Sequence, residues 1–306
     1  MRLNVGLPFL LDPMKNVLRW VAIVGSVLLG LLVLAAGVVY VMSERAIDRT
    51  YPIPKVALTL PDDPAAIAEG RRLAVMRGCV NACHGKEGEG KVMFDNAAIA
   101  RVVAPNLAAA ARRYDASQLA GIIRDGVRPD GHSMLIMPSE AFIALDDADL
   151  SRIIAYLKTL PQTAGPDAVN RYGPLGRVGL ATGQFKMVAQ TIAESTPPPE
   201  APGDAGGRGR YLARTICASC HGADLGGTSN PTFVAPDLSI VAGYTAVSFE
   251  TLLRKGVAAG DRPLKVMPVV VRDELAVLTD QEISAMYGYL RGLPEARATS
   301  ATAARK

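Results

Sequence analysis

Two short motifs contain every cysteine of the chain, and each motif ends in a histidine. The first motif occupies residues 79–84 (CVNACH) and the second occupies residues 217–221 (CASCH). In the attachment signature of c-type haem, two thiols reach the vinyl groups of one porphyrin and the adjacent imidazole binds the iron. The sequence therefore predicts two covalently bound haem c groups, attached through Cys79, Cys83, Cys217 and Cys220, with His84 and His221 as proximal iron ligands.

The first motif departs from the usual spacing because three residues separate its cysteines. One extra helical residue rotates Cys79 by about a third of a turn relative to Cys83. We therefore expect the segment to unwind or bulge near Val80 and Asn81, which Gly78 makes easier. A single thioether through Cys83 is the alternative. For either motif a redox disulfide or half of a zinc site is a further alternative, although neither chemistry needs the trailing histidine.

The amino-terminal region contains an uncharged stretch from Trp20 to Met42. At about 1.5 Å per residue it is long enough to cross a hydrocarbon core of ~30 Å. A cleavable signal has a shorter apolar stretch and a small-x-small cleavage site, so the pattern favours a retained single-pass anchor. Arg2, Lys15 and Arg19 precede the stretch, which places the amino terminus in the cytoplasm and the rest of the chain on the opposite side.

The remainder of the chain repeats itself, with matching landmarks in the same order. They are GRRLA at 70–74 and GRYLA at 209–213, the two haem motifs, VAPNL at 103–107 and VAPDL at 234–238, RDGV at 124–127 and RKGV at 254–257, Met-Pro at 137–138 and 267–268, and the closing stretches 155–161 and 288–294. We predict an anchor region at 1–45, a first domain at 55–165, a linker at 166–207, a second domain at 208–296 and a disordered tail at 297–306. Residues 172–192 of the linker contain apolar side chains and are expected to pack on a domain.

Each copy is expected to be mainly α-helical, with a helix entering the haem motif, irregular loops and a closing helix. The closing helices have amino-terminal caps at Asp146 and Thr279, and are expected to stop at Pro161 and Pro294. A glycine inside an amphipathic helix costs about 1 kcal/mol unless a close approach compensates. We therefore predict that Gly70 and Gly209 are crossing points against Tyr156 and Tyr289 of the closing helices.

The exported region, roughly residues 65–296, resembles membrane-anchored dihaem cytochromes c built from tandem class I-like domains. This resemblance implies a cytochrome c fold in which the first and last helices cross beside the haem. It also implies haem attachment outside a bacterial cytoplasmic (inner) membrane, and thus haem domains on the periplasmic side. In the family a proline carbonyl accepts a hydrogen bond from the proximal histidine. Pro105 and Pro236 are the matching residues, with an ordinary turn proline as the alternative.

The resemblance also implies a distal iron ligand, since class I-like cytochromes c use a methionine on the loop before the closing helix. Met137 and Met267, each followed by proline, are the predicted ligands. Met134 and His132 are alternatives to Met137. In the second copy Met286 is the local alternative to Met267, but it lies within the closing helix and is expected in the core.

The predicted function is electron transfer between a respiratory or dehydrogenase donor and another redox protein, such as a cytochrome or oxidase. This work needs no catalytic acid, base or nucleophile, so we predict no independent catalytic activity. A dihaem peroxidase is the enzyme alternative, but it needs an open distal site and commonly a tryptophan between the haems, whereas Trp20 lies in the anchor. A haem-based sensor is a further alternative. Charge is spread along the chain, which predicts no nucleic-acid partner.

Overall fold

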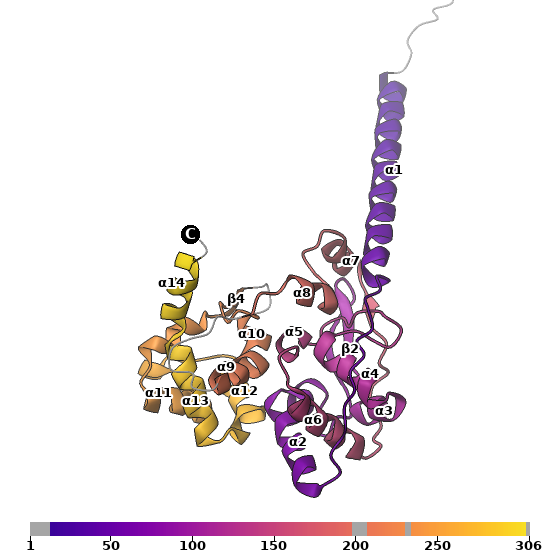
Figure 1. Cartoon of the computed structure of the whole chain (residues 1–306). Coiled ribbons are helices and arrows are strands. Elements are labelled where there is room, and N and C mark those ends of the chain that lie inside the picture. Colours follow the sequence, from indigo (N-terminus) through magenta and orange to yellow (C-terminus); the bar gives the residue numbers. More distant parts are fainter. Residues whose placement is uncertain (1–12, 198–206, 230–233, 304–306) are drawn as a thin grey trace, which may run out of the picture.

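The computed structural model describes residues 13–197, 207–229 and 234–303. The predicted cytoplasmic end before Pro13, most of the Pro- and Gly-rich part of the linker and the last three residues lie outside these ranges. One long helix, α1 (Pro13–Ile47), stands away from two helical bodies (Figure 1). The mainly α architecture with two successive copies of one unit is confirmed.

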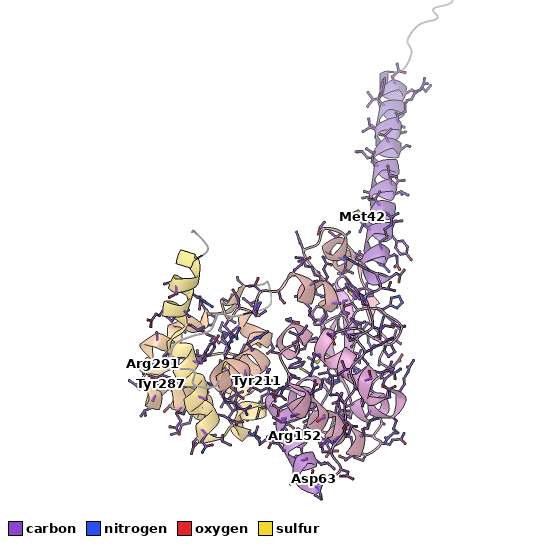
Figure 2. The ribbon with its side chains drawn as sticks, in the orientation of Figure 1. Met42, Asp63, Arg152, Tyr211, Tyr287 and Arg291 are labelled. Carbon is purple, nitrogen blue, oxygen red and sulfur yellow. The ribbon has the colours of Figure 1, made fainter. Side chains whose placement is uncertain are left out.

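Helix α1 contains the uncharged stretch, and its side chains from Lys15 to Val38 are exposed. By length and composition the helix could cross a membrane, or serve as a signal sequence. After α1 an extended segment, residues 48–62, runs along the first copy to Asp63 at the end far from α1 (Figure 2). Tyr51 N donates to Gly131 O over 2.8 Å, and Val56, Leu58 and Leu60 pack on the core. This segment therefore ties α1 to the first copy.

The first copy begins with α2 (Pro64–Met76), which the Asp63 side chain caps by accepting from Ala66 N. The haem motif follows as the π-helical turn η1 (Cys79–Cys83), and then a hairpin of β1 (Lys91–Asn96) and β2 (Ala100–Ala104). The remaining elements are α3 (Leu107–Arg113), α4 (Ala116–Ala120), η2 (Gly121–Asp125), α5 (Ser139–Phe142) and the closing helix α6 (Asp147–Thr159). The predicted cap at Asp146 is confirmed, since its carboxylate accepts from Asp149 N over 2.7 Å.

The segment between the copies packs on the first copy, as expected for residues 172–192. Strand β3 (Arg171–Tyr172) pairs antiparallel with β2 and completes the sheet order β1-β2-β3. Helix α7 (Pro174–Ala181) lies against α1, and α8 (Val188–Glu194) lies against α5. Met187, Val188 and Ala189 are buried.

The second copy has the same order of helices. It contains α9 (Arg208–Leu212), η4 (Ala213–Cys217), α10 (Ala218–His221), β4 (Thr228–Ser229), β5 (Val234–Ala235), η5 (Leu238–Gly243), α11 (Ala246–Lys255), η6 (Ala259–Asp261), α12 (Met267–Asp273), η7 (Leu275–Val277) and the closing helix α13 (Asp280–Arg291). The predicted cap at Thr279 is confirmed as a capping box with Glu282.

The prediction of a disordered tail was wrong for the residues that the structure describes. A further helix, α14 (Leu293–Ala303), follows α13 after Gly292. Pro294 does not prevent it, because proline is tolerated in the first turn of a helix, where its missing N–H has no intrahelical acceptor. Leu293 and Ala296 are buried, and Arg297 pairs with Asp237. Helix α14 is therefore fastened to the second copy.

The helix crossings predicted at the two glycines are confirmed. A Cβ atom at Gly70 would lie 2.0 Å from Arg152 O and 3.1 Å from Tyr156 Cβ. A Cβ atom at Gly209 would lie 2.2 Å from Ala285 O and 2.7 Å from Tyr289 Cβ. In both copies, the absence of a side chain lets the entering helix touch the backbone of the closing helix.

Candidate haem-binding sites

The second haem motif lies on helical backbone that runs without interruption from Arg208 to His221. The helix is α-helical up to Leu212, π-helical from Ala213 to Cys217 and α-helical again from Ala218. Ala213 and Ala218, where the type changes, both have right-handed helical dihedrals. Cys217 and Cys220, three residues apart, therefore project from the same helical face. Gly222 has φ 82° and ends the helix directly after His221. The thiols and the imidazole are thus presented together at one helix end.

The first haem motif has the bulge that its extra residue requires. Val80 has extended backbone dihedrals and Asn81 has φ 69°, while Gly78 before them has φ 70°. Beyond the bulge Cys83 N donates to Gly78 O over 2.9 Å and His84 N donates to Cys79 O over 3.2 Å. The extra residue is therefore absorbed locally, where the sequence predicted, and the turn closes again before His84.

Each motif histidine is held by a proline carbonyl. His84 Nδ1 lies 2.7 Å from Pro105 O, and His221 Nδ1 lies 2.8 Å from Pro236 O. Because a carbonyl oxygen can only accept, each Nδ1 carries the proton and each Nε2 keeps its lone pair. Burial lowers the pKa of both imidazoles, which favours this neutral form. The donor set therefore fits axial iron ligation through Nε2, and the family role of the two prolines is present.

All four cysteines are free thiols in half-buried positions. Burial raises the pKa of Cys79 and of Cys217 to about 12, and also raises the pKa of Cys83 and Cys220. Such protonated thiols in apolar surroundings suit a covalently held porphyrin better than a thiolate site. Across the described residues, no three His, Cys, Asp or Glu side chains are grouped to hold a metal ion, so the zinc alternative has no ligand set there.

The two predicted distal methionines occupy comparable places. Met137 lies just before α5 and Met267 opens α12, and both half-buried side chains pack against the core. Met286 is fully buried in the core, as expected. His132 pairs through its backbone with Thr50 and its Nδ1 lies 3.2 Å from Asp130 Oδ1, while Met134 is half-buried. Iron ligation by Met137 and Met267 stays a prediction.

The two copies bring their haem motifs to a shared interface. Helix α5, which follows Met137, packs against η4 and α10 of the second motif. The end of α12, which follows Met267, meets the first motif: Asn81 Nδ2 donates to Asp273 O over 3.3 Å, and the Glu274 carboxylate faces Gly78. The segment after each methionine therefore contacts the haem motif of the other copy. We call this arrangement the reciprocal interface.

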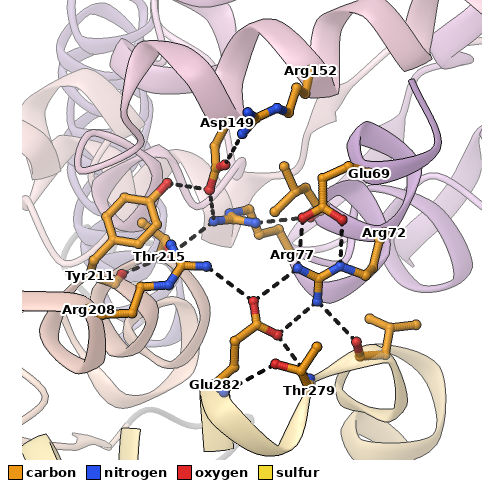
Figure 3. Close-up of polar contacts among 12 residues, drawn as sticks. Glu69, Arg72, Arg77, Asp149, Arg152, Arg208, Tyr211, Thr215, Thr279 and Glu282 are labelled. Atoms are coloured by element: carbon orange, nitrogen blue, oxygen red, sulfur yellow. Dashed lines mark hydrogen bonds and ion pairs between the residues drawn. The ribbon is translucent and has the colours of Figure 1, made fainter. Parts of the chain in front are cut away.

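A network of ion pairs and hydrogen bonds joins the entering and closing helices of the two copies at the reciprocal interface (Figure 3). Arg77 Nη2 lies 3.3 Å from Asp149 Oδ2 in the first copy and donates to Thr215 Oγ1 of the second over 3.2 Å. Tyr211 donates its hydroxyl proton to the same carboxylate over 2.6 Å. Nearby, Arg72 of the first copy binds both oxygens of Glu282 in the second, at 2.8 and 3.0 Å.

Glu274 is the residue near the sites that sequence reasoning missed. Its burial, together with the neighbouring Asp273, raises its pKa to about 7. The pKa of Cys83 is raised to about 11 by burial, then by the Glu274 charge, with a smaller effect from Cys220; the Glu274 charge also raises the pKa of Cys220. Glu274 therefore faces the first motif, and its charge acts on one attachment cysteine of each copy. It belongs to no motif, so nothing in the sequence pointed to it.

Comparison with known proteins agrees with this geometry. The family model described as Cytochrome c matches residues 67–161 and again residues 207–294. The chain is also 24% identical over 257 residues to a protein of Gluconobacter japonicus named fructose dehydrogenase cytochrome subunit. That match covers 75% of this chain and 53% of the relative, so the chain spans about half the length of the curated relative it matches.

Proposed function

Because this chain belongs to the cytochrome c family, we propose that it is a dihaem electron carrier, held at the bacterial cytoplasmic membrane by α1, with its haem domains on the periplasmic side. The observation that carries the proposal is the pair of equivalent sites, each with two free thiols and a histidine whose Nδ1 is bound by a proline carbonyl. Bound haem supplies a one-electron iron couple at each site.

The residues of the chain have three tasks in this function. Cys79, Cys83, Cys217 and Cys220 would hold the two porphyrins, and His84 and His221 would offer Nε2 to the two irons. The proline carbonyls keep the imidazole rings oriented and increase their basicity. Met137 and Met267 would be the second protein ligands of the irons, which would raise the reduction potentials and favour electron transfer over substrate chemistry.

The reciprocal interface favours transfer between the two sites within one chain. Helix α5 of the first copy packs against η4 and α10 of the second motif, and Asn81 of the first motif bonds to Asp273 of the second copy. Haems held at the two motifs would therefore have each other as nearby redox partners. By its likeness to a dehydrogenase cytochrome subunit, we propose a dehydrogenase as donor and a further redox protein, such as a cytochrome or oxidase, as acceptor.

The number of haems per chain is the decisive measurement. The purified full-length protein should contain two haems that survive denaturation and solvent extraction, measured from the reduced spectrum. A Cys217→Ala, Cys220→Ala variant should retain one, which isolates attachment at the first motif. One haem in the wild-type chain would contradict the proposal that both copies are redox sites.

The distal ligands are tested one at a time. Met267→Ala and Met137→Ala should each lower one of two midpoint potentials, by on the order of 100 mV within the ≈ 0.8 V that axial ligands can cover. Met134→Ala is the matched control and should leave both potentials in place. Vigorous peroxide turnover by the wild-type protein would instead favour a peroxidase.

A further inference from the structure

Helix α7 is fixed beside the end of the uncharged stretch of α1. Arg177 Nη1 donates to Glu44 Oε1 over 2.6 Å and to Ser43 Oγ over 2.9 Å. The same guanidinium lies 4.5 Å from the centroid of the Tyr40 ring. Ser43 is fully buried in this contact. Helix α7 is thus held at one level of α1, at the end of the first copy from which α1 rises (Figure 1).

This level matches the expected edge of a bilayer around α1. Trp20 is the first residue of the stretch and Tyr40 lies two residues before its last, Met42. Tryptophan and tyrosine are enriched at membrane interfaces. At about 1.5 Å per residue, the two rings are separated by ~30 Å, the thickness of a hydrocarbon core. Val39 is the first residue of α1 that the folded part of the protein partly covers. Met42, at the end of the stretch, lies where α1 meets the first copy (Figure 2).

Exposed apolar side chains gather around α7 at this level. Leu175 and Val178, one helical turn apart, are 61% and 41% exposed. Ile99 and Phe185 are also exposed. A Cβ atom at Gly176 would lie 2.1 Å from Ile99 O, and Phe185 N donates to Gly179 O, so both residues adjoin α7. We call Ile99, Leu175, Val178 and Phe185 the membrane-proximal patch.

We propose that the membrane-proximal patch rests in the lipid interface and forms a second membrane contact beside α1. The inference depends on the proposed role of α1 as an anchor. Lipid is the occupant we infer because α7 is bound to α1 at the depth where headgroups surround that helix. An apolar face beside an arginine at this depth is the composition of an interfacial helix. The second contact restricts the tilt of the first copy and therefore the height of its haem motif above the bilayer.

Photocrosslinking tests the inference in the full-length haem-loaded protein. The photoreactive residue p-benzoylphenylalanine replaces Leu175 or Val178, and the protein is reconstituted in vesicles of phosphatidylethanolamine and phosphatidylglycerol. After illumination, mass spectrometry should find lipid adducts at both positions, at yields within about threefold of a probe at Leu32 inside α1. Val247 on α11 is 73% exposed and is the matched control. Its lipid adducts should be at least about tenfold rarer, since α11 lies in the second copy, far from α1 (Figure 1).

The probe at Leu32 separates failure of the inference from failure of the anchor. Lipid adducts at Leu32 without adducts at Leu175 and Val178 would overturn the second contact and leave the anchor intact. Missing adducts at all three positions would overturn both. Crosslinks from position 175 to a protein would show that a protein, and not lipid, contacts the membrane-proximal patch, and would contradict the proposal. Covalent haem content equal to that of the wild type shows that each variant is folded.

Discussion

At the scale of single residues, the absence of a side chain matters as much as the chemistry of the haem ligands. Gly70 and Gly209 let the backbones of two helices touch. The orientation of the motif histidines depends on backbone carbonyl oxygens of Pro105 and Pro236, which a side-chain substitution does not remove. The glycine crossings could be predicted because both copies have a glycine at the equivalent position. The proline carbonyls were expected from the family resemblance instead, with an ordinary turn proline as the alternative.

Gly209→Ala should lower the free energy of unfolding by about 3 kcal/mol, because its Cβ would lie 2.2 Å from a carbonyl oxygen that belongs to a helix backbone. In an uncrowded helix the same change stabilises by about 1 kcal/mol. Gly243→Ala is the control, since a Cβ there meets nothing within 4 Å. Urea unfolding of both variants measures the difference. Equal stabilities would mean that α9 and α13 can separate without cost.

At the scale of helices and strands, local rules predicted the starts of elements better than their ends. A residue with a side-chain oxygen three positions before an acidic residue predicts a helix cap. The structure has such caps at Asp146 and Thr279. The bulge at Val80 and Asn81 followed from helix geometry alone. In contrast, β2 pairs with β3, and α14 contacts Asp237 through Arg297. These partners are distant in the sequence, so no local pattern reveals the contacts.

Helix α14 should contribute to the stability of the second copy through Arg297. Its guanidinium donates to Ser239 Oγ and Asp224 O, both over 2.9 Å, and pairs with Asp237. Arg297→Ala should cost about 1–2 kcal/mol of unfolding free energy. Arg291→Ala on the adjacent helix removes a contact with the Tyr287 ring and should cost roughly half a kcal/mol. Thermal unfolding of the two variants should rank them in this order, and the reverse order would contradict the fastening of α14.

At the scale of the whole molecule, the two copies behave as one folded body. A single cluster of buried apolar residues includes side chains from both copies, among them Leu73 and Leu212. The ion pair between Arg72 and Glu282 and the hydrogen bond from Arg77 to Thr215 cross the same boundary. Sequence repetition predicted two domains but could not predict this contact. Asp149 and Thr215, which help to form it, lie outside the repeated motifs, and Arg72 and Tyr211 occupy the one place at which GRRLA and GRYLA differ.

The Arg72–Glu282 pair should make stability depend on pH. Although burial alone would raise the pKa of Glu282, its bonds to Arg72 and to Thr279 N lower it to about 2. A lowered pKa stabilises the folded state above the unfolded value of about 4.5, and this stabilisation is lost as pH falls toward 2. Glu282→Gln should therefore be less stable than the wild type by up to about 3 kcal/mol at pH 7, and the difference should shrink toward pH 2.

Urea unfolding of both proteins at several pH values measures that difference. Asp280→Asn is the control, because Asp280 pairs with Arg254 within the second copy and its side chain is 87% exposed. Its effect should stay within about 1 kcal/mol at every pH. A gap between wild type and Glu282→Gln that does not change with pH would show that the carboxylate charge is not what joins the copies.

The reciprocal interface cannot form until both copies have been synthesised. Asn81 can donate its hydrogen bond to Asp273 only after Asp273, 192 residues later in the chain, has been made. At roughly 5–20 residues per second, a ribosome needs about 10–40 s to make that stretch. During this interval the first motif lacks the segment of the second copy that faces it in the finished fold. Its cysteines are therefore more accessible before Asp273 and Glu274 have been made than afterwards.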